Sequence, residues 1–149
     1  MADQSAHVIN MLKDMAAKEV ELAAEALAKA IKWANEAQGK YDMLSDYRKG
    51  YADNLSKSME SGISAESYIN FQNFLHKLDQ AMSGQMEAVE QAQRQVVIQK
   101  ELWQESQRKK LSYEVLSQRS DKKAHQAEQK KDQKMMDEYA TRMSRPSRK

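Results

Sequence analysis

The residues of this sequence that are capable of acid–base or metal chemistry are scattered along the chain. His7, His76 and His125 lie in separate regions, without carboxylate or cysteine clusters at the spacing of metal ligands. The segments SGIS and MSGQM lack the further glycines and the lysine of a phosphate-binding loop. The 22 Asp and Glu residues stand mostly in polar stretches, where carboxylates are usually solvated charges. We therefore expect no enzymatic activity, no metal and no cofactor.

Binding of partner proteins is the chemistry that the remaining residues favour. The segment YDMLSDYRKGYADNL, residues 41–55, contains Tyr41, Tyr47 and Tyr51 in a chain with few aromatic residues. At helical spacing such rings either fill a buried seam or form an exposed docking patch, since aromatic residues and Met are enriched at interfaces. The segment QKMMDEYATRM near the C-terminus raises the same two alternatives. The residue pattern alone leaves both open.

Long helices are the elements that must position these side chains. The only proline is Pro146, and charged residues make up 31% of the chain, which is typical of coiled coils. From residue 8 onward apolar residues recur at steps of three and four, which predicts amphipathic helices. The apolar positions of the first helix are Val20, Ala23, Leu27, Ile31, Ala34, Ala37, Tyr41, Leu44, Tyr47, Tyr51 and Leu55. Those of the second are Phe71, Phe74, Leu75, Leu78, Met82, Met86, Val89, Ala92, Val96, Trp103, Leu111 and Val115.

The segment MESGISAES is the best candidate for a break between two helices. Gly62 can adopt the left-handed conformation that ends a helix, and Ser64 is a candidate N-cap with Glu66 in the next turn. We expect the first helix over about 5–58, a link over about 59–64 and the second helix over about 65–143.

Two amphipathic helices with a short link are expected to fold back on each other. The predicted fold is all-α: a long two-helix antiparallel coiled-coil hairpin, as a single domain over 1–149. Such folding brings residue 5 to about residue 118, and the apolar pattern of the second helix fades beyond Leu116. The rest of that helix is therefore predicted to be a C-terminal helical overhang, followed by a basic tail at 144–149.

The charge is distributed unevenly. Residues 1–107 hold 11 Lys and Arg against 16 Asp and Glu, whereas residues 108–149 hold 13 against 6. A basic end suits nucleic acid, an anionic membrane surface or an acidic protein. Acidic residues interrupt the basic end and aromatic residues are sparse there, so nucleic acid binding is not expected. A basic-tailed hairpin that binds nucleic acid or an anionic membrane surface is the alternative function.

Compartment signals are few. No stretch approaches the roughly 20 apolar residues that a membrane-spanning helix needs, and the N-terminus lacks the basic and apolar regions of a signal peptide. Cysteine is absent, which fits a reducing compartment. We expect a soluble intracellular protein without a membrane span.

Four segments carry a specific likeness: MLKDMAAKEVE, MLSDYRKGYADNL, GISAESYINFQNFLHKLDQAM and DQKMMDEYATR. In this order and spacing the chain closely resembles the FliJ family of flagellar export proteins. The resemblance implies a stalk-like coiled coil of the type III flagellar export apparatus, located in the cytoplasm and peripherally at the cytoplasmic face of the inner membrane. It implies insertion into the export ATPase ring with promotion of ring assembly and activity. It also implies contact with the membrane export gate and binding of export chaperones for late flagellar substrates.

The resemblance also assigns candidate binding residues. Carried onto matching positions, the export-gate-binding surface comprises Leu44, Tyr47, Tyr51, Phe74, Leu78 and Ala81. The ATPase-binding residues are expected at the far end of the hairpin and in the overhang, and comprise Lys13, Glu19, Met135, Met136, Tyr139 and Arg142.

Overall fold

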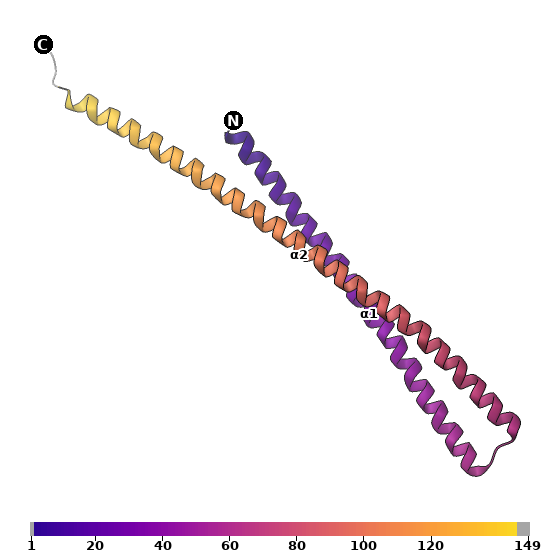
Figure 1. Cartoon of the computed structure of the whole chain (residues 1–149). Helices are drawn as coiled ribbons and strands as arrows, with labels where there is room; N and C mark the ends of the chain where they lie inside the picture. Colours follow the sequence, from indigo (N-terminus) through magenta and orange to yellow (C-terminus); the bar gives the residue numbers. More distant parts are fainter. Residues whose placement is uncertain (1, 146–149) are drawn as a thin grey trace. The chain divides into compact units, whose positions relative to one another are not determined.

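The structure, a computed structural model, describes residues 2–145, which form two helices (Figure 1). Helix α1 spans Ala2–Ser61 and helix α2 spans Ala65–Ser144. The two helices pack against each other, and the described residues form no strand. The predicted all-α helical hairpin is confirmed, and both helices run slightly past the expected 5–58 and 65–143. Residues 146–149 of the expected basic tail lie outside the described residues.

The link between the helices is a tight turn built by two residues. Gly62 has a φ of 87°, in the left-handed region, and its N–H donates to the carbonyl of Met59 at 3.3 Å. Ser64 then caps α2, because its Oγ accepts a hydrogen bond from the N–H of Ser67 at 3.1 Å. The predicted helix stop at Gly62 and the predicted N-cap at Ser64 are both confirmed.

Replacing Gly62 by alanine is expected to lower the free energy of unfolding by about 1 kcal/mol, because a Cβ is strained at positive φ. Gly84 is the matched control: it lies inside α2 and a Cβ there meets nothing within 4 Å. Gly84→Ala should raise stability by about 0.5–1 kcal/mol through helix propensity. Urea unfolding of both variants measures the difference, and equal shifts in the two would contradict the role of the turn.

The helix pair divides into two compact units, which we name by their contents. The turn unit comprises residues 22–103, and the terminal unit comprises residues 2–21 and 104–145 in the described part of the chain. The single domain expected over 1–149 stays a prediction.

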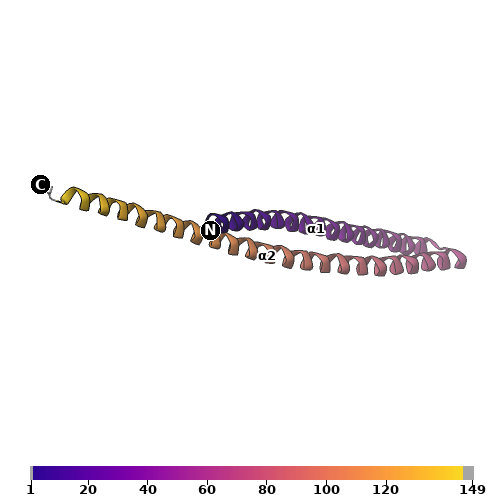
Figure 2. The ribbon, with the colours of Figure 1, turned by 90° about the horizontal axis from the view of Figure 1, so that it is seen from above.

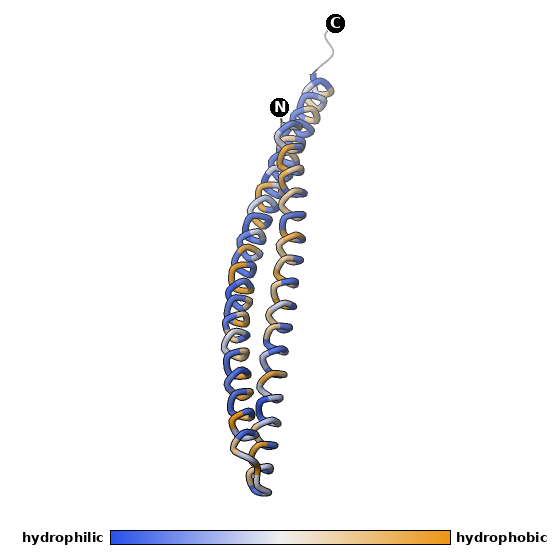
Figure 3. Tube along the Cα trace, turned by 90° about the vertical axis from the view of Figure 1, so that its right-hand side faces the viewer, coloured by the Kyte–Doolittle hydropathy of each residue, from blue (hydrophilic) through white to orange (hydrophobic). Residues whose placement is uncertain are grey.

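Within the turn unit, α1 and α2 run antiparallel and share a coiled-coil seam. Buried and half-buried residues alternate at steps of three and four along both helices, which is the heptad spacing. In Figure 3, hydrophobic stretches alternate with hydrophilic ones along the helices. Alanine occupies many seam positions, among them Ala23, Ala30, Ala37 and Ala92. Small side chains at these positions leave little apolar volume between the helices, so the seam is narrow.

The seam of α1 departs from the prediction at Ile31. Ala30 is buried, whereas Ile31 is 43% exposed. Regular heptad spacing decides this choice, because one residue of displacement turns a side chain by about 100° around the helix axis. Near the turn, half-buried Arg48 occupies the seam, and Tyr47, which the residue pattern left open between seam and docking patch, is exposed.

The seam of α2 departs from the prediction in the terminal unit. Leu111 is 59% exposed and Val115 is 37% exposed, although both were expected to be buried. Lys110, Tyr113 and Ser117 occupy the seam positions instead, and Ser117 is buried. Heptad continuity again outweighs residue size.

The terminal unit contains the expected overhang. Glu19 of α1 pairs with Lys109 of α2, with Oε2 and Nζ 3.2 Å apart. Every residue from 121 to 145 is exposed, so α1 covers none of this part of α2. Figure 2 shows this end of α2 continuing past the start of α1. The predicted C-terminal helical overhang is confirmed.

Candidate functional site

The turn unit contains a hydrophobic cluster next to the turn. Leu55, Leu75 and Leu78 are buried, and Leu44, Tyr51, Ala52, Ile63, Phe71 and Phe74 pack against them. The ring of Tyr51 lies between two rings of α2, with centroids 5.1 Å from Phe71 and 4.4 Å from Phe74. Such ring contacts stabilise beyond simple area burial. The cluster fixes the aromatic side chains of this segment in place.

A pair of aromatic rings, one exposed and one half-buried, lies at the surface of this cluster. Tyr47 is 56% exposed, and its ring meets that of Phe74 edge-on at 6.1 Å. Each of the two residues directly precedes a seam position of its helix, as does exposed Ala81. In an antiparallel coiled coil these positions of the two helices line the same flank. We call Tyr47, Phe74 and Ala81 the aromatic flank.

The six predicted gate-binding residues lie in one region of the structure but differ in how far they are buried. Leu78 is only 7% exposed, and Leu44 and Tyr51 are half-buried against the cluster. Within the aromatic flank, Tyr47 and Ala81 are exposed and Phe74 is half-buried. Leu78 can therefore support a docking surface but offers almost no surface itself.

Two polar contacts hold the helix register beside the aromatic flank. Arg48 donates from Nε to Oδ1 of Asp79 at 2.5 Å and from Nη2 to Oδ2 at 3.3 Å. The side-chain amide of Gln85 donates to the carbonyl of Ala37 at 3.0 Å. Directional contacts of this kind specify register where small seam residues specify it weakly.

The Arg48–Asp79 pair makes stability depend on pH. The hydrogen bond from Arg48 holds the pKa of Asp79 below its ordinary value, with desolvation acting in the opposite direction and the charges of Arg48 and His76 adding to the lowering. Because the folded-state pKa is depressed, this stabilisation is present above the unfolded value of about 4 and is lost as pH falls through the folded value. Asp79→Asn should therefore lose less stability than the parent between pH 7 and pH 3 in urea unfolding. Identical losses would contradict the pair.

The predicted ATPase-binding residues fall into two groups within the terminal unit. Lys13 is half-buried in the seam, and Glu19 is exposed and paired with Lys109. Met135 lies 26 residues beyond Lys109 on α2, which is about 39 Å along a helix. The structure therefore does not bring the two groups into one site.

The second group forms an exposed stripe on the overhang. Met135, Met136, Tyr139 and Met143 are 60–73% exposed, and their spacing of three and four residues places them on one side of α2. Arg142 lies at the edge of this side and is also exposed. We call Met135, Met136, Tyr139 and Met143 the methionine stripe.

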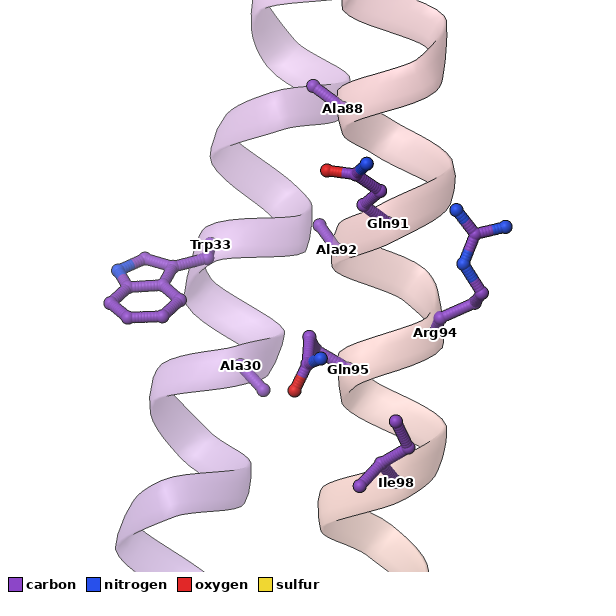
Figure 4. Close-up of a pocket in the computed structure, with 8 residues that line it drawn as sticks. All are labelled: Ala30, Trp33, Ala88, Gln91, Ala92, Arg94, Gln95 and Ile98. Carbon is purple, nitrogen blue, oxygen red and sulfur yellow. The ribbon is translucent and has the colours of Figure 1, made fainter.

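Sequence reasoning missed the most exposed large ring of the turn unit, Trp33. It is 63% exposed and lies beside a hollow of about 400 Å³ between the helices. In Figure 4, Ala30 and Ala92 point into the space between the helices, whereas Trp33 and Arg94 project outward from α1 and α2. The sequence feature that could have identified Trp33 is its heptad position. Trp33 directly precedes seam residue Ala34 and lies two heptads before Tyr47.

Comparisons with known proteins agree with the likeness in the four segments. The family described as Flagellar FliJ protein matches residues 6–149. The Flagellar FliJ protein of Escherichia coli (strain K12) is 34% identical over 131 residues, which cover 88% of this chain and 89% of that protein. The chain belongs to the FliJ family. The Flagellar FliJ protein of Salmonella typhi is 33% identical over 134 residues, covering 90% of this chain and 91% of that protein.

A solved structure shares the fold at low sequence identity. The putative YscO homolog of Chlamydia trachomatis matches with a TM-score of 0.72 and 13% identity, covering 94% of this chain and 91% of that one. Membership of the FliJ family makes the chain a component of the flagellar type III protein export apparatus. Across residues 2–145, neither helix has an apolar stretch long enough to cross a membrane.

Proposed function

We propose that this FliJ-family chain is a non-enzymatic, stalk-like regulator of the export apparatus. Its overhang inserts into the export ATPase ring and promotes ring assembly and activity. Its aromatic flank contacts the cytoplasmic part of the membrane export gate and takes part in binding and recycling export chaperones for late substrates. The chain acts in the cytoplasm and peripherally at the cytoplasmic face of the inner membrane at the flagellar base.

The observation that carries the gate assignment is that exposed Tyr47 is anchored against half-buried Phe74. Tyr47 keeps 56% of its surface exposed while its ring is held against Tyr51 at 6.4 Å and Phe74 at 6.1 Å. A ring held in place loses little conformational entropy on binding, and tyrosine is enriched among residues that dominate binding energy. The aromatic flank thus has the properties of a preorganised docking surface.

The overhang supports the ATPase assignment in a different way. A helix that is exposed on every side over residues 121–145 buries none of its methionine stripe against α1. Exposed Met and Tyr side chains in a row on one helix favour insertion into an apolar groove of a partner. A ring that surrounds this helix would bury the stripe that α1 leaves uncovered.

Binding of the purified gate domain tests the proposal. Tyr47→Ala should weaken affinity about 30-fold, the effect of removing an interface residue worth about 2 kcal/mol, as measured by titration calorimetry. Tyr68→Ala is the matched control, because Tyr68 is a partly exposed tyrosine outside the aromatic flank. Its affinity should stay within about twofold of the parent.

Two results would refute the gate assignment. One is parent-like gate affinity in Tyr47→Ala. The other is an equal loss in Tyr68→Ala, since that would trace the effect to the turn end in general.

A further inference from the structure

The terminal unit carries a second exposed surface that the proposed function does not use. On α2, the residues Arg108, Leu111, Val115, Arg119 and Lys122 follow one another at steps of three or four, so they form one row along the helix. All five are exposed. We call them the arginine row.

The middle of the arginine row is apolar and hollowed. Leu111 is 59% exposed, Val115 is 37% exposed, and neighbouring Leu116 is 45% exposed. A shallow, open hollow on the surface of α2 lies over them and is bordered by Arg108 at one end and Arg119 at the other. This surface therefore offers a partner apolar contacts from three aliphatic side chains and hydrogen-bond donors from two guanidinium groups.

Cations outnumber carboxylates around the row. Arg108, Arg119 and Lys122 lie in the row, and Glu105 stands one turn before Arg108. Glu114 and Asp121 lie about 60° or more around the helix axis from every residue of the row. Glu114 also pairs with Lys110, with Oε1 and Nζ 3.9 Å apart. The field over the hollow is therefore positive and favours an acidic partner.

We propose that the arginine row docks an acidic amphipathic helix of another protein. Leu and Ile side chains of that helix fill the hollow over Leu111 and Val115. Its carboxylates, placed three turns apart, bind Arg108 and Arg119, which lie about 16 Å apart along α2. A guanidinium group matches a carboxylate in a bidentate pair, which fixes the register of the docked helix.

The geometry of the row favours a protein helix over an anionic membrane. A helix that lies in a membrane surface separates a broad apolar face from a charged face. Here the cations stand in line with the aliphatic residues and interrupt them. Insertion deep enough to bury Leu111 and Val115 would carry Arg108 and Arg119 into the acyl region.

A labelled synthetic peptide tests the proposal on the full chain. The probe is an 18-residue helical peptide with a central Leu pair and Glu residues three turns apart, and its counterpart has Lys at the Glu positions. Fluorescence anisotropy should show at least tenfold tighter binding of the acidic peptide. Arg119→Glu and Leu111→Ala should each weaken that binding about tenfold.

Lys131→Glu is the matched control, because it makes the same charge change on the same helix away from the row. Its affinity should stay within twofold of the parent, and circular dichroism checks that all variants remain helical. Equal binding of the acidic and basic peptides, or equal loss in Arg119→Glu and Lys131→Glu, would overturn the proposal. So would tighter binding to phosphatidylserine vesicles or to a 20-base-pair duplex than to the acidic peptide.

Discussion

Leu78→Ala is expected to lower the free energy of unfolding by about 3 kcal/mol, the cost of removing a buried leucine side chain and leaving a cavity. Leu78 is only 7% exposed and belongs to the buried cluster with Leu55 and Leu75. Urea unfolding followed by circular dichroism measures the loss.

Tyr47→Ala is the informative partner of this variant, because resemblance assigns both residues to gate binding. Tyr47 is 56% exposed and contributes mainly its ring contacts, so its removal should cost about 1 kcal/mol. Weak gate binding by Leu78→Ala would then result from partial unfolding of the chain. Weak gate binding by Tyr47→Ala would result from loss of a direct contact with the gate, because that variant stays folded. A loss of stability in Tyr47→Ala as large as that in Leu78→Ala would contradict this separation.

The largest functional effect is expected from the methionine stripe. Changing Met135, Met136 and Tyr139 together to serine should abolish stimulation of the export ATPase. The free energy of unfolding should change by less than about 0.5 kcal/mol, because the residues are 60–73% exposed and pack against nothing in α1. Steady-state hydrolysis by the purified ATPase, with and without each variant, gives the measurement.

The control for this triple variant lies on the same helix. Lys134 and Asp137 point to the other side of α2 from Tyr139. Changing both to alanine should leave stimulation unchanged. Full stimulation by the serine variant would remove the methionine stripe from the ATPase interface, and equal loss in the control would show that the effect is not specific to the stripe.

Local chemistry made the elements predictable. Sustained spacing of three and four indicated helices, and Gly62 and Ser64 marked their boundary through left-handed φ and capping. The overhang was predictable because the apolar pattern fades beyond Leu116 near the level that the start of α1 reaches. The helices and their boundary depend on neighbouring residues only, whereas the overhang also required the expectation that the two helices fold back on each other.

The face that each side chain presents was less predictable. Ile31, Leu111 and Val115 were expected in the seam and are exposed, whereas Ala30 and Ser117 are buried. Residue size suggests the opposite choice in each case. Heptad continuity along both helices decides the register, and a single step of error moves a side chain from the seam to solvent.

The sequence by itself determined the two helices, their turn, the unpaired end of α2 and, through the likeness in four segments, the family. Only the tertiary structure separated supporting residues from presenting ones: Leu78 lies inside the cluster, while Tyr47 lies on its surface against Phe74. It also revealed the arginine row, because Leu111 and Val115, which the sequence pattern had assigned to the seam, are exposed to solvent. The physical reason is that burial depends on the partner helix, whereas helix formation and capping depend on the chain's own neighbours.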